Sequence, residues 1–167
     1  MRTGWLIFLA LVTALLQTAL HGLGANVVIP NLPLVLIVWI APRVSAARLS
    51  AIAVTMGIIL ESNSLLPFGT QLLGLLVFVL AAKLILQEET ESRLGFQVAL
   101  VVAATMISVA ISAASLPFSD IAQFWTTILF QGALESLYNG IIIVLLAGLT
   151  NGRSRRGDQQ RRYRLPA

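Results

Sequence analysis

Polar side chains spaced along an apolar stretch near the C-terminus are the first candidates for chemistry in this sequence. Five of them follow steps of three and four residues, Thr127, Gln131, Glu135, Tyr138 and Asn139. Such steps place side chains on one face of a helix. In a hydrocarbon environment polar groups need a partner or water. Three roles fit this face: a hydrogen-bond cluster that holds helices in register, a partner-binding or cavity face, and a proton or ion relay.

Glu61 is the second candidate, because it follows directly on the apolar stretch 46–60. A carboxylate at the C-terminus of a helix opposes the helix dipole. We therefore expect a hydrogen-bond donor near Glu61, either a loop N–H or one of Ser62, Asn63 and Ser64. Structural and functional roles are both open for this residue.

The inventory of catalytic and metal-binding residues is otherwise short. There is no cysteine, which excludes disulfides and thiolate sites, and His21 is the single histidine. The sequence has no glycine-rich phosphate loop and no serine with a base at motif spacing. Glu61 and Glu135 are too few ionisable groups for acid–base chemistry in a membrane. We predict a protein that is not an enzyme, with no catalytic residue, no cofactor and no metal.

The elements that position these residues follow from composition. Of 167 residues, 57% are hydrophobic and 11% charged, with a mean hydropathy of +0.90. A soluble domain is about 25% charged. Because a membrane-spanning helix needs roughly 20 apolar residues, the length allows about six such helices and only short loops.

Six apolar stretches are present, and they predict an all-α polytopic membrane protein with six transmembrane helices. The stretches are 4–20, 27–41, 46–60, 69–86, 94–114 and 121–149. We take residues 1–150 as one transmembrane domain and residues 151–167 as a basic, disordered cytoplasmic tail. The first stretch also resembles a signal peptide, with Arg2, an apolar core and small residues after it. Its uninterrupted length favours a retained helix.

The positions of the basic residues predict the orientation. With the N-terminus inside, all eleven Lys and Arg residues fall on the cytoplasmic side, six of them in the tail. Cytoplasmic segments of membrane proteins carry an excess of Lys and Arg. Both termini are therefore expected in the cytoplasm. Beside an apolar span, the basic tail indicates contact with anionic membrane lipids and not with nucleic acid.

Three groups of residues resemble motifs of the MreD family of bacterial rod-shape proteins. They are Pro30-Asn31-Leu32-Pro33-Leu34 at the start of the second stretch, Gly57 to Glu61 followed by Pro67-Phe68-Gly69-Thr70, and Tyr138-Asn139 before a final apolar run and basic end. The order and spacing of these motifs cover nearly the whole chain. The family usually has Asp at the position of Glu61, so the charge is kept on a longer side chain.

The resemblance implies a fold like the substrate-binding subunits of energy-coupling-factor vitamin transporters, which also have six helices. It implies a non-enzymatic scaffold in the bacterial inner membrane that binds MreC and helps regulate peptidoglycan synthesis and cell shape. RodA, its penicillin-binding transpeptidase and, at the cytoplasmic face, MreB are further implied partners. The alternative is a vitamin-binding transporter subunit on the same architecture. Short outer loops poor in polar residues favour the scaffold, because a ligand site would enclose its ligand with such residues.

Overall fold

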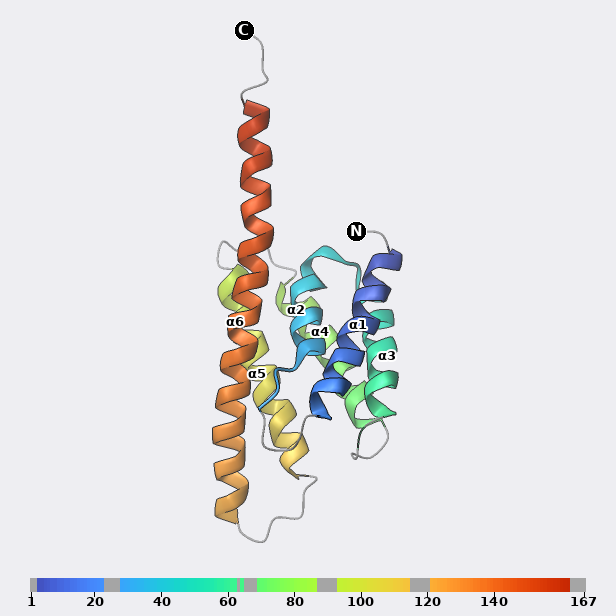
Figure 1. The fold of residues 1–167 in the computed structure, drawn as a ribbon, viewed down its shortest axis with the longest axis vertical. Coiled ribbons are helices and arrows are strands. Elements are labelled where there is room, and N and C mark those ends of the chain that lie inside the picture. Colours follow the sequence, from blue (N-terminus) through green and yellow to red (C-terminus); the bar gives the residue numbers. More distant parts are fainter. Residues whose placement is uncertain are drawn as a thin grey trace.

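The computed structural model describes residues 3–22, 28–62, 64, 69–86, 93–114 and 121–162, and these ranges contain helices and connecting segments without a strand. The all-α prediction is confirmed for this part of the chain. These residues form six α-helices and one 3₁₀ turn: α1 (Thr3–His21), α2 (Leu32–Ile40), η1 (Ala41–Arg43), α3 (Ala46–Glu61), α4 (Thr70–Leu86), α5 (Arg93–Ala114) and α6 (Ile121–Arg162). Figure 1 shows how the helices are arranged.

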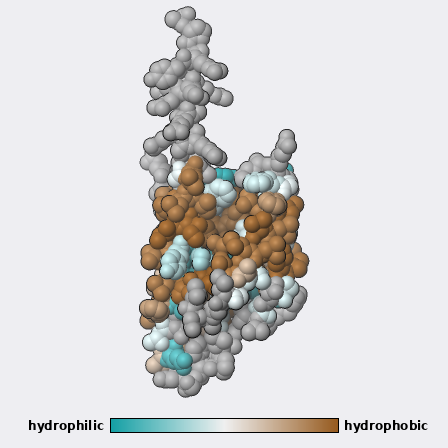
Figure 2. Space-filling model, viewed as in Figure 1, coloured by the Kyte–Doolittle hydropathy of each residue, from teal (hydrophilic) through white to brown (hydrophobic). Residues whose placement is uncertain are grey.

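Three segments are long and apolar enough to cross a membrane, as judged by length and composition: Gly4–His21, Leu94–Ala114 and Ile121–Leu149. The apolar helices Leu32–Arg43 and Thr70–Ile85 are shorter. Large apolar side chains cover the surface, with Phe8, Leu80 and Leu129 each more than half exposed. Figure 2 shows a hydrophobic band across the face of the bundle that is in view. The surface is that of a membrane protein, because water would disfavour so large an apolar area.

Helix α2 lies at the centre of the bundle. It contacts α1, α3, α4, α5 and α6, while α5 packs along α6 and α3 packs between α1 and α4. Its sequence, LPLVLIVWI, has no polar face, and seven of its nine residues are buried. A helix that is apolar all round is stable when it is covered on every side. Pro33 lies in its first turn, where no intrahelical N–H bond is lost.

Helices α3 and α4 are in close contact at Gly57. A β-carbon built on Gly57 would lie 2.7 Å from Leu72 Cδ1 and 2.9 Å from Leu72 Cα. Real β-carbons essentially never approach another atom so closely. The glycine is therefore required for the contact between the two helices, and not for a special backbone angle.

Beyond Leu149, α6 continues as one straight helix away from the bundle, as Figure 1 shows. Residues 151–162 are helical, which differs from the disordered tail expected from the sequence; residues 163–167 lie outside the described residues. Extension of an existing helix avoids the cost of nucleation. Arg and Gln, which dominate this segment, also have good helix propensity.

Candidate functional site

The first turn of α2 is held by side chains from other helices. The backbone N–H of Asn31 donates to Asn139 Oδ1 of α6 at 2.9 Å, and the N–H of Leu32 donates to Gln17 Oε1 of α1 at 3.0 Å. Asn31 Oδ1 accepts from the N–H of Leu34 at 3.2 Å as the N-cap. A helix N-terminus leaves several N–H groups without intrahelical partners. Inside a bilayer these must be satisfied by protein, which the three contacts achieve.

Asn139 is the centre of this cluster. It is fully buried, and its Nδ2 donates to Thr105 Oγ1 of α5 at 2.8 Å. Thr105 donates in turn to the carbonyl of Val101 at 2.8 Å. One side chain thus connects α6 and α5 to the start of α2. Asn139 therefore lies inside the bundle. Its hydrogen bonds fit the first of the three roles considered above, a cluster that holds helices in register.

Glu61 holds the N-terminus of α4. Its side chain is 6% exposed, and Oε1 accepts the N–H groups of Gln71 at 2.6 Å and Leu72 at 3.1 Å. The predicted donor near Glu61 exists, but it is the first turn of the next helix. A carboxylate is favourable at a helix N-terminus, which offsets its unfavourable place at the end of α3. The second oxygen, Oε2, is buried and accepts no hydrogen bond.

Lys83 makes the corresponding contact near the other end of α4. Its Nζ donates to the carbonyl of Ala41 at 2.6 Å and also to the carbonyl of Val44. These carbonyls lie at the 3₁₀ turn η1, where helical hydrogen bonding ends. Sequence reasoning used Lys83 for orientation only and did not single out Gln17 or Thr105. The available signal for Gln17 and Lys83 was a single polar or charged residue within an otherwise apolar helix, which indicates a hydrogen-bonding role inside the bundle.

Three residues of the predicted face on α6 remain outside the core. Tyr138 is 44% exposed, Gln131 is exposed and Glu135 is half-buried. In the described part of the chain, none of the three forms a hydrogen bond or an ion pair. The side chain of Thr127 lies outside the described residues. Figure 2 shows a hydrophilic patch over α6 within the hydrophobic band. We call Gln131, Glu135 and Tyr138 the polar stripe.

The single predicted face therefore divides in two, which corrects the expectation from spacing. Tyr138 and Asn139 are consecutive, and consecutive helical residues point about 100° apart at 3.6 residues per turn. One of them turns inward to α5 and α2, and the other is exposed. Asn139 therefore has hydrogen bonds of the kind expected for the internal role, whereas a partner-binding role for the exposed residues stays a prediction.

Two hollows lie in the bundle near the residues described above. A pocket of about 40 Å³ lies among α2, α4 and α5, with Asn31, Gln71 and Ser112 in its lining. That volume holds little more than one water molecule. A wider apolar groove of about 690 Å³ runs between α5 and α6, lined by residues including Val102, Ser136 and Gly140. The hydroxyl of Ser136 is buried without a hydrogen-bond partner.

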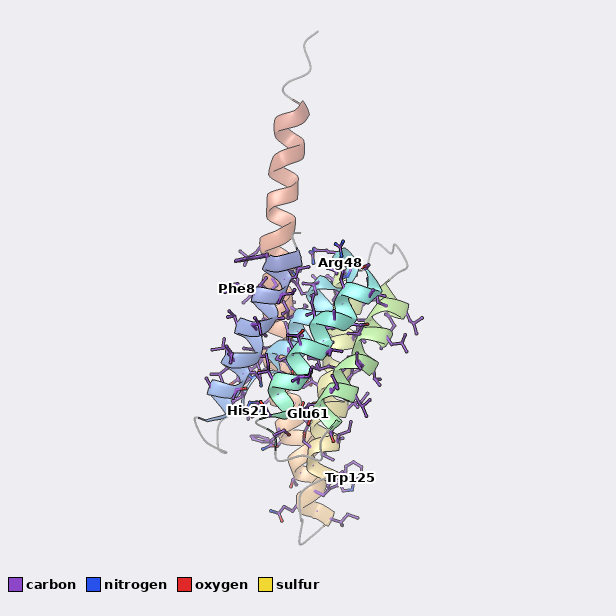
Figure 3. All side chains as sticks on the ribbon, turned by 90° about the vertical axis from the view of Figure 1, so that its right-hand side faces the viewer. Phe8, His21, Arg48, Glu61 and Trp125 are labelled. Carbon is purple, nitrogen blue, oxygen red and sulfur yellow. The ribbon has the colours of Figure 1, made fainter. Side chains whose placement is uncertain are left out.

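Arg48 and Glu61 lie toward opposite ends of the bundle. Figure 3 places Arg48 at the end from which the tail leaves, and His21 and Glu61 toward the opposite end. His21 is the last residue of α1, and its Nδ1 lies 2.8 Å from the carbonyl oxygen of Gln17, one turn earlier in the same helix. Among the described residues, no three His, Cys, Asp or Glu side chains gather into a group that would hold a metal ion.

Comparison with known proteins adds no relative. A scan against protein-family models matches none, and searches of curated proteins and of solved structures return no match.

Proposed function

We propose that this chain is a non-enzymatic membrane scaffold of the bacterial wall-elongation (rod) complex, of the MreD type. One observation carries the proposal: residues from motifs that resemble this family meet one another in the folded chain. Asn31 of the first motif bonds to Asn139 of the last, and Glu61 bonds to the first turn of α4, just after Gly69-Thr70. Contacts between separated motifs give their order and spacing a physical reason, which supports a shared fold.

We propose further that all six helices cross the inner membrane, with both termini in the cytoplasm. The short helices α2 and α3 are compatible with this arrangement because the N-terminus of α2 is satisfied by Gln17 and Asn139. The carboxylate of Glu61 likewise joins the end of α3 to the start of α4. Arg48 and the tail at one end of the bundle fit the excess of positive charge on cytoplasmic segments.

The small size of the described pocket favours a scaffold over a vitamin-binding transporter subunit. Sites for small organic ligands are commonly about 300–1,000 Å³. The pocket beside Asn31 measures about 40 Å³, and the groove of about 690 Å³ between α5 and α6 is lined by apolar side chains apart from Ser136, so it lacks the several polar groups that would orient a vitamin. The sides of α6 present larger surfaces for contact: the polar stripe on one side and the apolar groove on the other. These are surfaces suited to other transmembrane helices, such as the single span of MreC or the spans of RodA and its transpeptidase.

Isolation of the tagged protein from native membranes in mild detergent tests this proposal. We expect MreC among the recovered proteins, and rounded cells with delocalised wall synthesis after depletion. The matched control is an unrelated multispan protein carrying the same tag at the same abundance. Rod-shaped growth after depletion, together with loss of uptake of a vitamin, would establish the transporter alternative instead.

A further inference from the structure

We propose that the groove between α5 and α6 binds one acyl chain of a phospholipid from the leaflet opposite the tail, and that the Ser136 hydroxyl donates to the ester carbonyl at the start of that chain. The inference goes beyond the proposed function and does not depend on it. Among the described residues that line the groove, Ser136 has the only polar side chain. The groove therefore combines one hydrogen-bond donor with an apolar wall, which is the pattern of an amphipathic ligand.

The hydroxyl of Ser136 lacks an acceptor. The residue is 6% exposed, and in the described part of the chain its Oγ has no hydrogen-bond partner. Other hydroxyls of the bundle are satisfied within their own helix, since Thr13 and Thr105 donate to the carbonyl four residues earlier. A buried hydroxyl without a partner is costly. An acceptor that enters the groove would remove this cost.

The contacts of α6 place Ser136 near the edge of the hydrocarbon core. Asn139 bonds to the first turn of α2, which also bonds to Gln17, one turn before the end of α1 at His21. Ser136 lies about 4.5 Å farther from the tail than Asn139, at the helical rise. Its hydroxyl is therefore at about the level where α1 ends. Trp125 lies farther still from the tail (Figure 3), and Trp is typical of the membrane–water interface.

The length of the groove matches one leaflet. From Ser136 toward the tail the groove follows α6 as far as Leu145, a distance of about 14 Å at the helical rise. Half of the hydrocarbon core is about 15 Å thick. A β-carbon built on Gly140 would meet nothing within 4 Å, so the middle of the groove is open. A lipid whose ester carbonyl is bonded to Ser136 thus has space for its chain along the groove.

A transmembrane helix fits the groove less well than an acyl chain. A helix about 10 Å across would occupy about 1,400 Å³ over the 18 Å or so between Ala133 and Leu145. The groove measures about 690 Å³, so a helix would cover it without entering it. A second copy docked here would also bring two straight α6 helices together, each continuing into a segment 151–162 with five Arg and one Asp. Like charge disfavours that arrangement.

The charges near Ser136 select the headgroup. Between Arg93 and Arg153 the sequence has no Lys or Arg, and its two acidic residues are Asp120 and Glu135. Glu135 precedes Ser136 directly on α6. A lipid phosphate at this level has no cation from α5 or α6 to pair with, whereas an ammonium group has a carboxylate. The geometry therefore favours a zwitterionic lipid with an amine, such as phosphatidylethanolamine, over an anionic lipid.

Photolabelling of the full-length chain in vesicles tests this site. The probe is phosphatidylethanolamine with a diazirine on its acyl chain, in vesicles of phosphatidylethanolamine and phosphatidylglycerol. We expect mass spectrometry to map the label to Val102 and Val144 of the groove, at least about tenfold above Leu73 and Leu80, which are exposed apolar residues of α4. A larger share of unlabelled phosphatidylethanolamine should displace the groove label, and a larger share of phosphatidylglycerol should not.

Two variants test how the chain is held. Gly140→Phe places a ring in the open part of the groove and should lower the groove label at least about tenfold, because the space is filled. The matched control is Gly148→Phe on the same helix, where a β-carbon also meets nothing and the residue lies outside the groove. Ser136→Ala should lower the label about threefold to tenfold, the value of one neutral hydrogen bond. If Gly140→Phe does not fold, the label map and the competition in the native chain decide.

Equal labelling of the groove and of α4 would mean that the groove holds only bulk lipid, and would overturn the inference. An unchanged groove label in Ser136→Ala, or a preference for phosphatidylglycerol, would also overturn it. So would replacement of the lipid label by crosslinks to a second copy or to a foreign helix when the same probe is used in native membranes. Recovery or loss of MreC has no bearing on these results, so the scaffold assignment and the lipid site can fail separately.

Discussion

Asn31 and Asn139 lie 108 residues apart in the sequence, and the N–H of Asn31 donates to the side-chain oxygen of Asn139 at 2.9 Å. The contact joins the start of the central helix α2 to α6, and Thr105 extends it to α5. Polar residues buried in this protein thus act mainly at helix ends. Asn139, Gln17, Glu61 and Lys83 each satisfy backbone groups of an element other than their own.

Loss of the amide at position 139 should destabilise the bundle. Asn139→Leu leaves the N–H of Asn31 and the hydroxyl of Thr105 without this partner. A buried polar group left without a partner costs about 1–3 kcal/mol. We expect thermal unfolding in detergent, followed by tryptophan fluorescence, at a clearly lower temperature. Tyr138→Phe, one residue away on the exposed side, should change the stability by less than about 0.5 kcal/mol. Equal melting of both variants would show that the cluster does not support the fold.

The carboxylate of Glu61 should matter for the pairing of α3 and α4. Glu61→Leu removes the acceptor of two N–H groups at the start of α4. We expect a loss of about 1–3 kcal/mol by the same measurement, and a smaller loss for Glu61→Gln, which keeps an acceptor oxygen. The control is Ser62→Ala, since the Ser62 hydroxyl bonds to the carbonyl of Ile59 in its own turn. A stable Glu61→Leu protein would contradict the capping role.

A single methyl group at position 57 should separate α3 from α4. In Gly57→Ala the new carbon would lie 2.9 Å from Leu72 Cα, a backbone atom that cannot move alone. Overpacking of this kind costs about 1–3 kcal/mol. The control Gly74→Ala, where no atom lies within 4 Å, should be neutral or stabilise α4 by up to about 1 kcal/mol. Unchanged stability of Gly57→Ala would mean that the helices are not in close contact.

The proposed six-span topology predicts which positions react with membrane-impermeant thiol reagents. Because the chain has no cysteine, single cysteines give an unambiguous signal. Ser64→Cys should be labelled in intact cells, whereas Ser92→Cys and Ser154→Cys should react only after the membrane is opened. Labelling of Ser154→Cys from outside, or its absence at Ser64→Cys, would contradict the arrangement.

The sequence by itself determined the helical class and the approximate apolar stretches. Composition limits such a chain to helices in a membrane, because every backbone group there must be satisfied internally. The wholly apolar sequence of α2 also indicates its central place, since each of its faces must be covered. The resemblance to MreD stays a prediction.

Only the tertiary structure decided how each polar residue is used. Spacing assigned Gln131, Glu135, Tyr138 and Asn139 to one face, but the packing of α5 and α2 against α6 divides them. Asn139 is bonded inside, while the polar stripe remains outside. The donors to Glu61 and the acceptors of Lys83 could not be predicted from the sequence either, because they are backbone groups of other elements. Periodicity fixes the direction of a side chain relative to its own helix, and the helix that meets it depends on long-range packing.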